Sequence, residues 1–298
     1  MEGAIHGVAV DAGSGLAAGI ASARGAHAQE DDILTFKRAV VETLGPGAST
    51  ILVDAACGRD LLASFPADCA PMLAFEADVY HISDEDRITV LPNNLTVEDY
   101  PDLRVKDLKF FIYYAPDDDP ELNARKQDLV AEIGARCRAA GVRYLMEPLV
   151  YHPTLQPGTA AYAAAKPDLV RRATEVFAHS RFAVDVLKVE VPVDLAFVEG
   201  FGQPEMTRDE ALNAFRAAAA PAEGIGLVYL SAGVPFEAFE TSLRLAREAG
   251  VACDGFMCGR AIWSDAVAVF GAEAEVGLRK WLADVGRSRL NRLIDALD

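Results

Sequence analysis

Short apolar segments rich in β-branched residues recur eight times along the chain, and this recurrence constrains the possible folds most. Segments of this kind are typical of strands buried on both faces of a parallel sheet. Strand–helix alternation predicts an α/β protein, and eight units in 298 residues favour a closed (β/α)8 barrel, or TIM barrel. The predicted strands are residues 4–10, 50–53, 72–75, 108–114, 142–149, 182–191, 226–230 and 254–258.

Between the strands, apolar residues mostly recur at helical spacing. The first three units are the least regular, so an open doubly wound sheet remains an alternative to the barrel. Residues 12–28 show no clear period and indicate a loop or a weak helix, while residues 78–102 form a long acidic irregular segment. No linker or repeat divides the chain, so we expect one domain over residues 1–298. The predicted helices are residues 33–44, 122–137, 161–178 and 236–249, one opened by a capping box at Thr207 and Glu210, and others after residue 262.

The charge balance restricts the partners of the protein. Asp and Glu number 45 against 28 Lys and Arg, which gives a net charge of −17. Nucleic acids and anionic membrane surfaces bind basic patches, so we expect neither as a partner. The apolar runs are also far shorter than the ~20 residues that a membrane span needs.

Cysteines and histidines argue against disulfides and metal sites. The five cysteines are odd in number and lack paired metal-type spacing, and the five histidines are scattered. The first residues carry no basic region followed by a long apolar run, so we expect no signal peptide. We therefore predict a cytoplasmic protein that uses no metal and no other cofactor, and we expect a homo-oligomer.

Charged side chains within apolar strands are the main candidates for chemistry. Lys188 lies at the centre of the apolar segment 182–192, and Lys109 and Glu147 lie inside two other predicted strands. A buried ammonium must be paired with a carboxylate or lose its proton. A neutral lysine attacks carbonyl groups to form Schiff bases, and a second lysine nearby favours the neutral form.

Two structural alternatives compete with a catalytic role for these charges. Lys188 could form a simple ion pair with Glu190 or Asp185. Lys109, Glu147 and Lys188 could also form a network that only stabilises the barrel. Either arrangement would satisfy a buried charge without any chemistry.

In such a barrel the active site lies at the C-terminal ends of the strands. Asp11 and Glu76 end the first and third predicted strands and are secondary candidates, because strand-end carboxylates also serve only as hydrogen-bond acceptors. The loops after strands seven and eight usually bind phosphate through backbone N–H groups, and glycine permits close approach. In this chain they contain Ser231, Gly233, Gly259 and Arg260. A buried lysine beside a phosphate site suggests carbonyl chemistry on a phosphorylated sugar.

Five motifs carry a resemblance to a known family. They are Leu-Met-Glu-Pro at 145–148, Arg-Phe-Ala-Val-Asp-Val-Leu-Lys-Val-Glu-Val-Pro-Val at 181–193, Val-Glu-Gly-Phe at 198–201, Tyr-Leu-Ser-Ala-Gly-Val at 229–234 and Met-Cys-Gly-Arg-Ala-Ile-Trp at 257–263. With these motifs the chain resembles the class I tagatose-bisphosphate aldolase family, which also contains sulfofructose-phosphate aldolases. The similarity runs from about residue 108 to the C-terminus.

The resemblance implies a (β/α)8 barrel enzyme, a lyase that splits a ketose bisphosphate into dihydroxyacetone phosphate and an aldehyde without a metal. It implies that Lys188 is the Schiff-base lysine, Glu147 the acid/base group and Lys109 a further active-site lysine. It also implies a site for the phosphate of the dihydroxyacetone half. That site would comprise Ser231, Gly233, Gly259 and Arg260.

The first strand departs from the family pattern. The family typically reads Asp-Gln-Arg-Gly there, whereas residues 11–14 read Asp-Ala-Gly-Ser. The acid is kept as Asp11, but the arginine that would contact an anion at the far end of the substrate is missing. The sequence therefore does not identify the chemical group at the far end of the substrate. It also does not decide whether Asp11 or Glu147 is the base for carbon–carbon cleavage.

Two rival functions remain beside an aldolase. The same barrel and phosphate site would serve a sugar-phosphate isomerase or epimerase that forms no covalent intermediate. The altered first-strand loop also admits an inactive barrel retained as a binding protein.

Overall fold

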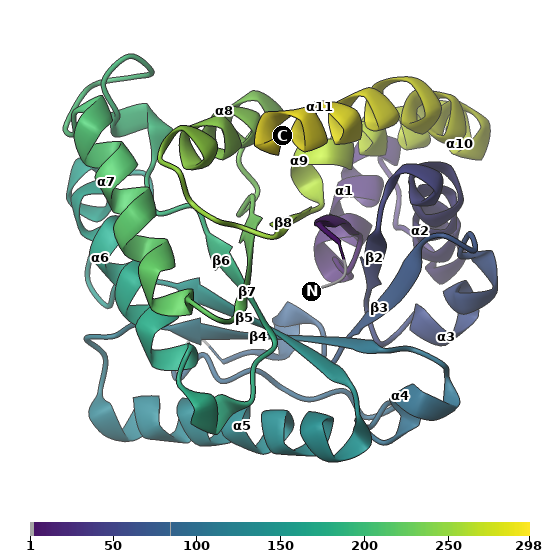
Figure 1. Ribbon diagram of the computed structural model, residues 1–298. Coiled ribbons are helices and arrows are strands. Elements are labelled where there is room, and N and C mark those ends of the chain that lie inside the picture. Colours follow the sequence, from purple (N-terminus) through teal and green to yellow (C-terminus); the bar gives the residue numbers. More distant parts are fainter. Residues whose placement is uncertain (1–2, 84) are drawn as a thin grey trace.

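Eight parallel strands close into a barrel in chain order, with β1 pairing with both β2 and β8. This computed structural model describes residues 3–83 and 85–298, so Met1, Glu2 and Asp84 lie outside the described residues. The closed barrel is confirmed, and the open sheet is wrong (Figure 1). The strands are β1 (Ile5–Ala9), β2 (Thr50–Val53), β3 (Ala70–Ala74), β4 (Asp107–Tyr114), β5 (Arg143–Val150), β6 (Val186–Glu190), β7 (Gly226–Leu230) and β8 (Gly255–Cys258).

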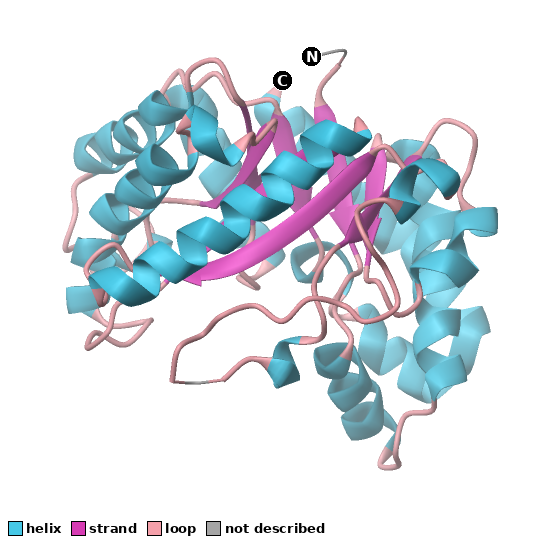
Figure 2. Ribbon diagram, turned by 90° about the horizontal axis from the view of Figure 1, so that it is seen from below, coloured by secondary structure: helices cyan, strands magenta, loops and turns pink. Residues whose placement is uncertain are grey.

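Helices surround the strands on the outside of the barrel (Figures 1 and 2). None of those in the described residues is long and apolar enough to cross a membrane. The helices are α1 (Ser14–Arg24), α2 (Glu30–Leu44), α3 (Gly58–Leu61), α4 (Asp99–Asp102), α5 (Pro120–Ala140), α6 (Ala160–Phe177), α7 (Arg208–Ala219), α8 (Phe236–Glu248), α9 (Arg260–Trp263), α10 (Ala266–Trp281) and α11 (Arg287–Leu297).

Local signals in the sequence account for several helix ends. Thr207 and Glu210 form the predicted capping box at the start of α7. Asp119 caps α5 by accepting hydrogen bonds from two backbone N–H groups. Gly141 ends α5 in the left-handed conformation, with a φ of 69° that glycine adopts without strain. Within residues 12–28 the structure forms a helix, α1, and not a loop.

The predicted start of the sixth strand is wrong. Ser180–Phe182 forms a 3-10 turn in which the His179 ring accepts a hydrogen bond from the Arg181 N–H. Ala183 then adopts a left-handed φ of 52°, which no strand residue can adopt. The β6 strand therefore begins only at Val186, although the apolar run begins earlier.

The barrel interior below the polar strand ends is filled by a small apolar cluster. Its members are Ile5, Ala9, Leu52, Met72, Ala74, Leu145, Val186, Val228 and Met257. Because side chains alternate along a strand, Glu147 lies on the same face of β5 as Leu145, and Lys188 on the same face of β6 as Val186. The charged residues therefore point into the barrel, above this cluster.

Candidate active site

Two lysines share one carboxylate oxygen inside the barrel. On β6, Lys188 places its Nζ 2.9 Å from Oε2 of Glu147, which lies on the neighbouring strand β5. The Nζ of Lys109, on β4, lies 3.0 Å from the same oxygen. All three side chains are buried. The structure thus brings together the three charged residues that the sequence singled out within strands.

Lys109 also contacts the two carboxylates at the ends of β1 and β3. Its Nζ lies 2.5 Å from Oε1 of Glu76 and 3.1 Å from Oδ2 of Asp11. The cluster therefore holds two lysines and three acids, joined through Lys109 and Glu147. Releasing the Lys188 nitrogen breaks one ion pair, whereas releasing the Lys109 nitrogen breaks three.

The surroundings shift the pKa values of these groups in different directions. Burial would lower the pKa of Lys109, but its three carboxylates outweigh burial and hold that pKa well above its usual value. For Asp11, burial is likewise outweighed, by Lys109 and Lys188 together, and the pKa falls to about 2. For Glu76, burial dominates over Lys109 and raises the pKa to about 7. Lys109 is therefore a fixed cation at neutral pH, while Glu76 exchanges its proton there.

The alternative prediction, an ion pair of Lys188 with Glu190 or Asp185, is wrong. The Asp185 carboxylate accepts a hydrogen bond from the Tyr144 N–H at 2.7 Å, at the start of β5. Glu190 lies 3.4 Å from Lys166 of α6 and accepts a hydrogen bond from the Val150 N–H. Both acids therefore have other partners, and the contact of Lys188 is with Glu147.

The residues predicted to bind phosphate lie at the ends of β7 and β8. Ser231 is buried directly after β7, and Gly259 follows β8 and precedes α9. Gly233 has a φ of 78°, and a Cβ on it would lie 2.9 Å from Cζ of Arg260. The Arg260 guanidinium therefore lies against the glycine backbone. Among the described residues no carboxylate pairs with it, so its donors are available to an anion.

Three further charged groups near the strand ends were missed from the sequence. Lys37, on α2, forms a buried ion pair with Asp54 at the end of β2. A lysine on the apolar face of an amphipathic helix was a usable signal for this pair, and the same holds for Lys166 of α6. Asp78 contacts Ser14 at the start of α1, and no local pattern indicates that contact.

The donor chemistry gives little support for a metal. Within residues 3–83 and 85–298, no three or more His, Cys, Asp or Glu side chains are grouped so that they could hold an ion. The three acids of the cluster are instead engaged with Lys109.

Comparisons with known proteins identify the family of the chain. A profile of the "DeoC/LacD family aldolase" matches residues 6–265. A tagatose 1,6-diphosphate aldolase of Listeria monocytogenes is 33% identical over 305 residues, covering 100% of this chain and 88% of its own length. A protein of the same name from Staphylococcus epidermidis is 35% identical over 296 residues, covering 98% of this chain and 91% of its own length.

Solved structures share the fold. A fructose-bisphosphate aldolase of Plasmodium falciparum superimposes with a TM-score of 0.71 at 14% identity, covering 98% of this chain and 89% of that chain. A Schiff-base-forming fructose-1,6-bisphosphate aldolase gives a TM-score of 0.59, also at 14% identity, covering 95% of this chain and 94% of that chain. At this identity the likeness concerns the barrel alone. The profile and the full-length relatives go further, and by them this chain belongs to the DeoC/LacD family of aldolases, which are lyases.

Proposed function

We propose that the protein is a class I aldolase that cleaves a phosphorylated ketose through a Schiff base on Lys188. The observation that carries the proposal is the unequal pairing of the two buried lysines. Lys109 is held by three carboxylates, whereas Lys188 contacts one, which it shares with Lys109. Lys188 is therefore the amine that can leave its protein partner and attack a carbonyl.

The chemistry follows from this arrangement. The amine of Lys188 adds to C2 of the ketose, and the carbinolamine loses water to give an iminium. Breakage of the C3–C4 bond sends its electron pair into the iminium, while a base takes the proton of the C4 hydroxyl. The aldehyde leaves, the enamine is protonated at C3, and water releases the second product and the free amine.

Glu147 is the proton carrier that fits these steps. Its Oε2 contacts the Lys188 nitrogen, so it can move protons at the carbinolamine and at the C4 hydroxyl. Asp11 is the weaker candidate because a pKa of about 2 makes its carboxylate a poor proton acceptor at neutral pH. Lys109 stays cationic and holds Glu147, Glu76 and Asp11 in place.

The phosphate of the substrate would bind beside Ser231, Gly233, Gly259 and Arg260. A phosphate at C1 of the ketose then leaves with the Lys188 half, as dihydroxyacetone phosphate. The names of the relatives favour a tagatose-type sugar, and the sulfofructose type remains a second substrate to test. Work in the cytoplasm and assembly as a homo-oligomer stay predictions from the sequence.

Reduction with borohydride tests the covalent step. The protein is incubated with a ketose phosphate and borohydride, digested, and analysed by peptide mass spectrometry. We expect an adduct on the peptide with Lys188, none on the peptide with Lys109, and none in Lys188→Arg. Lys166→Arg is the matched control, since Lys166 is also buried against a glutamate, and it should keep the adduct.

Product analysis separates the rival functions. An isomerase or epimerase would convert the sugar without releasing a triose phosphate and without an adduct. Turnover that is unchanged in Lys188→Arg would contradict the proposal.

A further inference from the structure

The N-terminus of α1 opens onto the strand ends and is already occupied by a carboxylate of the chain itself. The Ser14 N–H donates to Oδ2 of Asp78 at 2.6 Å, and the Ser14 hydroxyl donates to Oδ1. A Cβ at position 13 would clash with the same carboxylate, so Gly13 gives it room. A helix N-terminus attracts anions, and here the Asp78 carboxylate already occupies that position.

The surrounding strand ends add to this negative charge. Asp11, Asp54, Glu76 and Asp78 follow β1, β2 and β3. Among the described residues, the cations near these acids are Lys37, Lys109 and Lys188, and each already contacts a carboxylate. Asp11 and Asp78 both act electrostatically on Lys37, which places these groups in one region. A second phosphate or sulfonate here would face more carboxylates than cations, at a cost in free energy.

The same region suits hydroxyl groups. Oε2 of Glu76 is buried and has no hydrogen-bond partner within the described residues. A hydroxyl group can donate to this oxygen when Glu76 is ionised and accept from it when Glu76 is protonated, so it can pair with Glu76 in either state. The far hydroxyls of a sugar would therefore satisfy this buried oxygen, whereas the ionised form of Glu76 would repel an anionic group.

Cations suited to an anion lie elsewhere around the barrel. Arg260, after β8, lies against Gly233 with its donors free of ion pairs in the described residues. The Arg87 guanidinium stacks on the ring of Tyr151, which follows β5. The hydroxyl of that tyrosine donates a hydrogen bond to the Asp118 carboxylate. The strand ends thus have a cationic side at β7 and β8 and an anionic side at β1 to β3.

We propose that Asp78 is a specificity residue that rejects an anionic far end, so that the substrate is a ketose 1-phosphate whose other end is hydroxylated and uncharged. The inference rests on the aldolase function proposed above. One phosphate binds beside Arg260, and the far hydroxyls lie toward Glu76 and Asp11. Cleavage of the C3–C4 bond then gives dihydroxyacetone phosphate and a neutral aldehyde.

Steady-state kinetics with four sugars test this inference. The probes are the 1-phosphates and the 1,6-bisphosphates of D-tagatose and D-fructose, so that both C4 epimers are included. We expect the wild-type protein to have the higher kcat/KM for the 1-phosphate of whichever epimer it cleaves. A higher kcat/KM for the bisphosphate would overturn the inference, most directly if Arg87→Ala abolished that preference.

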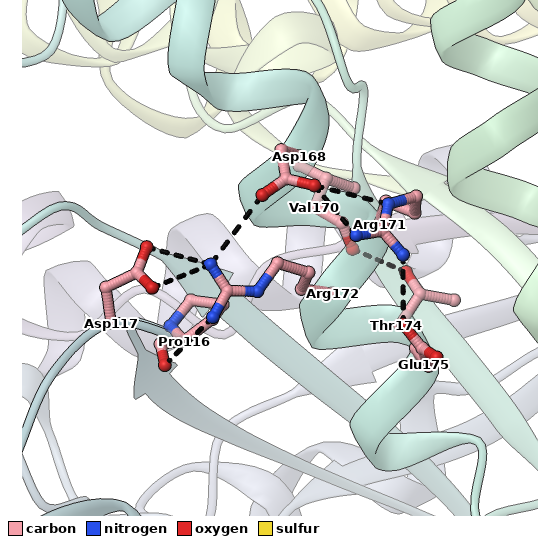
Figure 3. Close-up of polar contacts among 8 residues, drawn as sticks. All are labelled: Pro116, Asp117, Asp168, Val170, Arg171, Arg172, Thr174 and Glu175. Atoms are coloured by element: carbon pink, nitrogen blue, oxygen red, sulfur yellow. Dashed lines mark hydrogen bonds and ion pairs between the residues drawn. The ribbon is translucent and has the colours of Figure 1, made fainter. Parts of the chain in front are cut away.

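Variants that remove one negative charge identify the residue responsible. Asp78→Asn should reduce the preference for the 1-phosphate about tenfold, chiefly through improved turnover of the bisphosphate. Asp168→Asn is the matched control. Asp168 is an exposed acid of α6 that pairs with Arg171 and Arg172 in a surface network (Figure 3). Equal effects of the two variants would overturn the assignment to Asp78.

The possible failures are distinguishable. If wild-type protein releases no triose phosphate from any of the four sugars and borohydride traps nothing on Lys188, the proposed function fails and this inference fails with it. If the bisphosphates are preferred while the Lys188 adduct forms, only this inference fails. Should Asp78→Asn not fold, as judged by circular dichroism, the wild-type preference and Ser14→Ala, which removes one hydrogen bond to Asp78, still decide.

Discussion

Glu76 is the acid in the cluster whose protonation changes near neutral pH. Its pKa is raised from the usual 4.5 to about 7, so the folded protein holds a proton that the unfolded chain releases. This contribution to stability is present below pH 4.5 and is lost as the pH rises to 7. Asp11 behaves in the opposite way, because its lowered pKa contributes stability above pH 3.8 that is lost toward pH 2.

Replacing Glu76 with Gln should remove this pH dependence. Between pH 5 and 8, we expect the free energy of unfolding of the wild type to fall by about 1–3 kcal/mol relative to that of Glu76→Gln. Urea unfolding at several pH values measures the difference. Glu132→Gln, at an exposed position of α5, should follow the wild type. A constant difference between wild type and Glu76→Gln across this range would contradict the assignment.

At the residue scale, the sequence allowed the central cluster to be predicted but not its border. Lys109, Glu147 and Lys188 stand out because each interrupts an apolar strand. Asp78 does not stand out, because it is one of many acids in an irregular segment. Its contact with Ser14 spans 64 positions and depends on how that segment crosses the barrel mouth. A single sequence carries no signal for a contact of that kind.

Among the secondary-structure elements, α5 depends on one glycine where it packs on the turn before β6. A Cβ on Gly134 would clash with the backbone carbonyl of Phe182. We expect Gly134→Ala to destabilise the fold by about 1–3 kcal/mol, because the backbone cannot yield as a side chain would. Gly15→Ala, in α1 with open space around it, should cause no loss. Urea unfolding of both variants measures the contrast, and equal stabilities would contradict it.

The elements themselves were predicted best where periodicity and caps agreed, as in α5 and α7. The prediction was wrong at the start of β6, where an apolar run continued through a turn. There the left-handed Ala183 and the His179 cap override the β-forming composition. For α1, small residues without a period hid a helix whose buried face comprises only Leu16 and Ile20.

At the scale of the whole molecule, the barrel closes where β1 pairs with β8, and we call this junction the seam. The Ile5 N–H donates to the Asp254 carbonyl at 2.7 Å, and the Trp263 indole N–H donates to the Ala9 carbonyl at 2.8 Å. Gly255 begins β8 with a φ of 141°, and a Cβ there would clash with the Ile5 carbonyl. The seam therefore requires glycine at this position for two reasons.

Gly255→Ala should consequently destabilise the barrel by about 3 kcal/mol or more, through both strain and the clash. Gly250→Ala is the matched control. Gly250 has a φ of 72° but open space around it, so we expect a loss of only about 1 kcal/mol. Thermal and urea unfolding measure both variants. Similar losses in the two would show that the seam tolerates a side chain.

The closed barrel followed from counting strands and from their alternation with helices, both of which are local patterns. The register of β1 against β8 and the residues that hold this seam did not follow, because they join parts of the chain about 250 positions apart. Sequence patterns therefore predicted the strands and the helices between them, whereas only the structure shows which atoms close the barrel.

The seam also has a consequence for synthesis of the chain. Strand β1 leaves the ribosome before the other strands of the barrel, and its partner β8 and Trp263 follow about 250 residues later. At 5–20 residues per second, β1 waits roughly 12–50 seconds with one edge unpaired. Near the other terminus, α11 packs on α8, and Asp298 acts electrostatically on His6 of β1. The nascent chain therefore completes its barrel only once β8 has emerged, and until then chaperones have an open strand edge to bind.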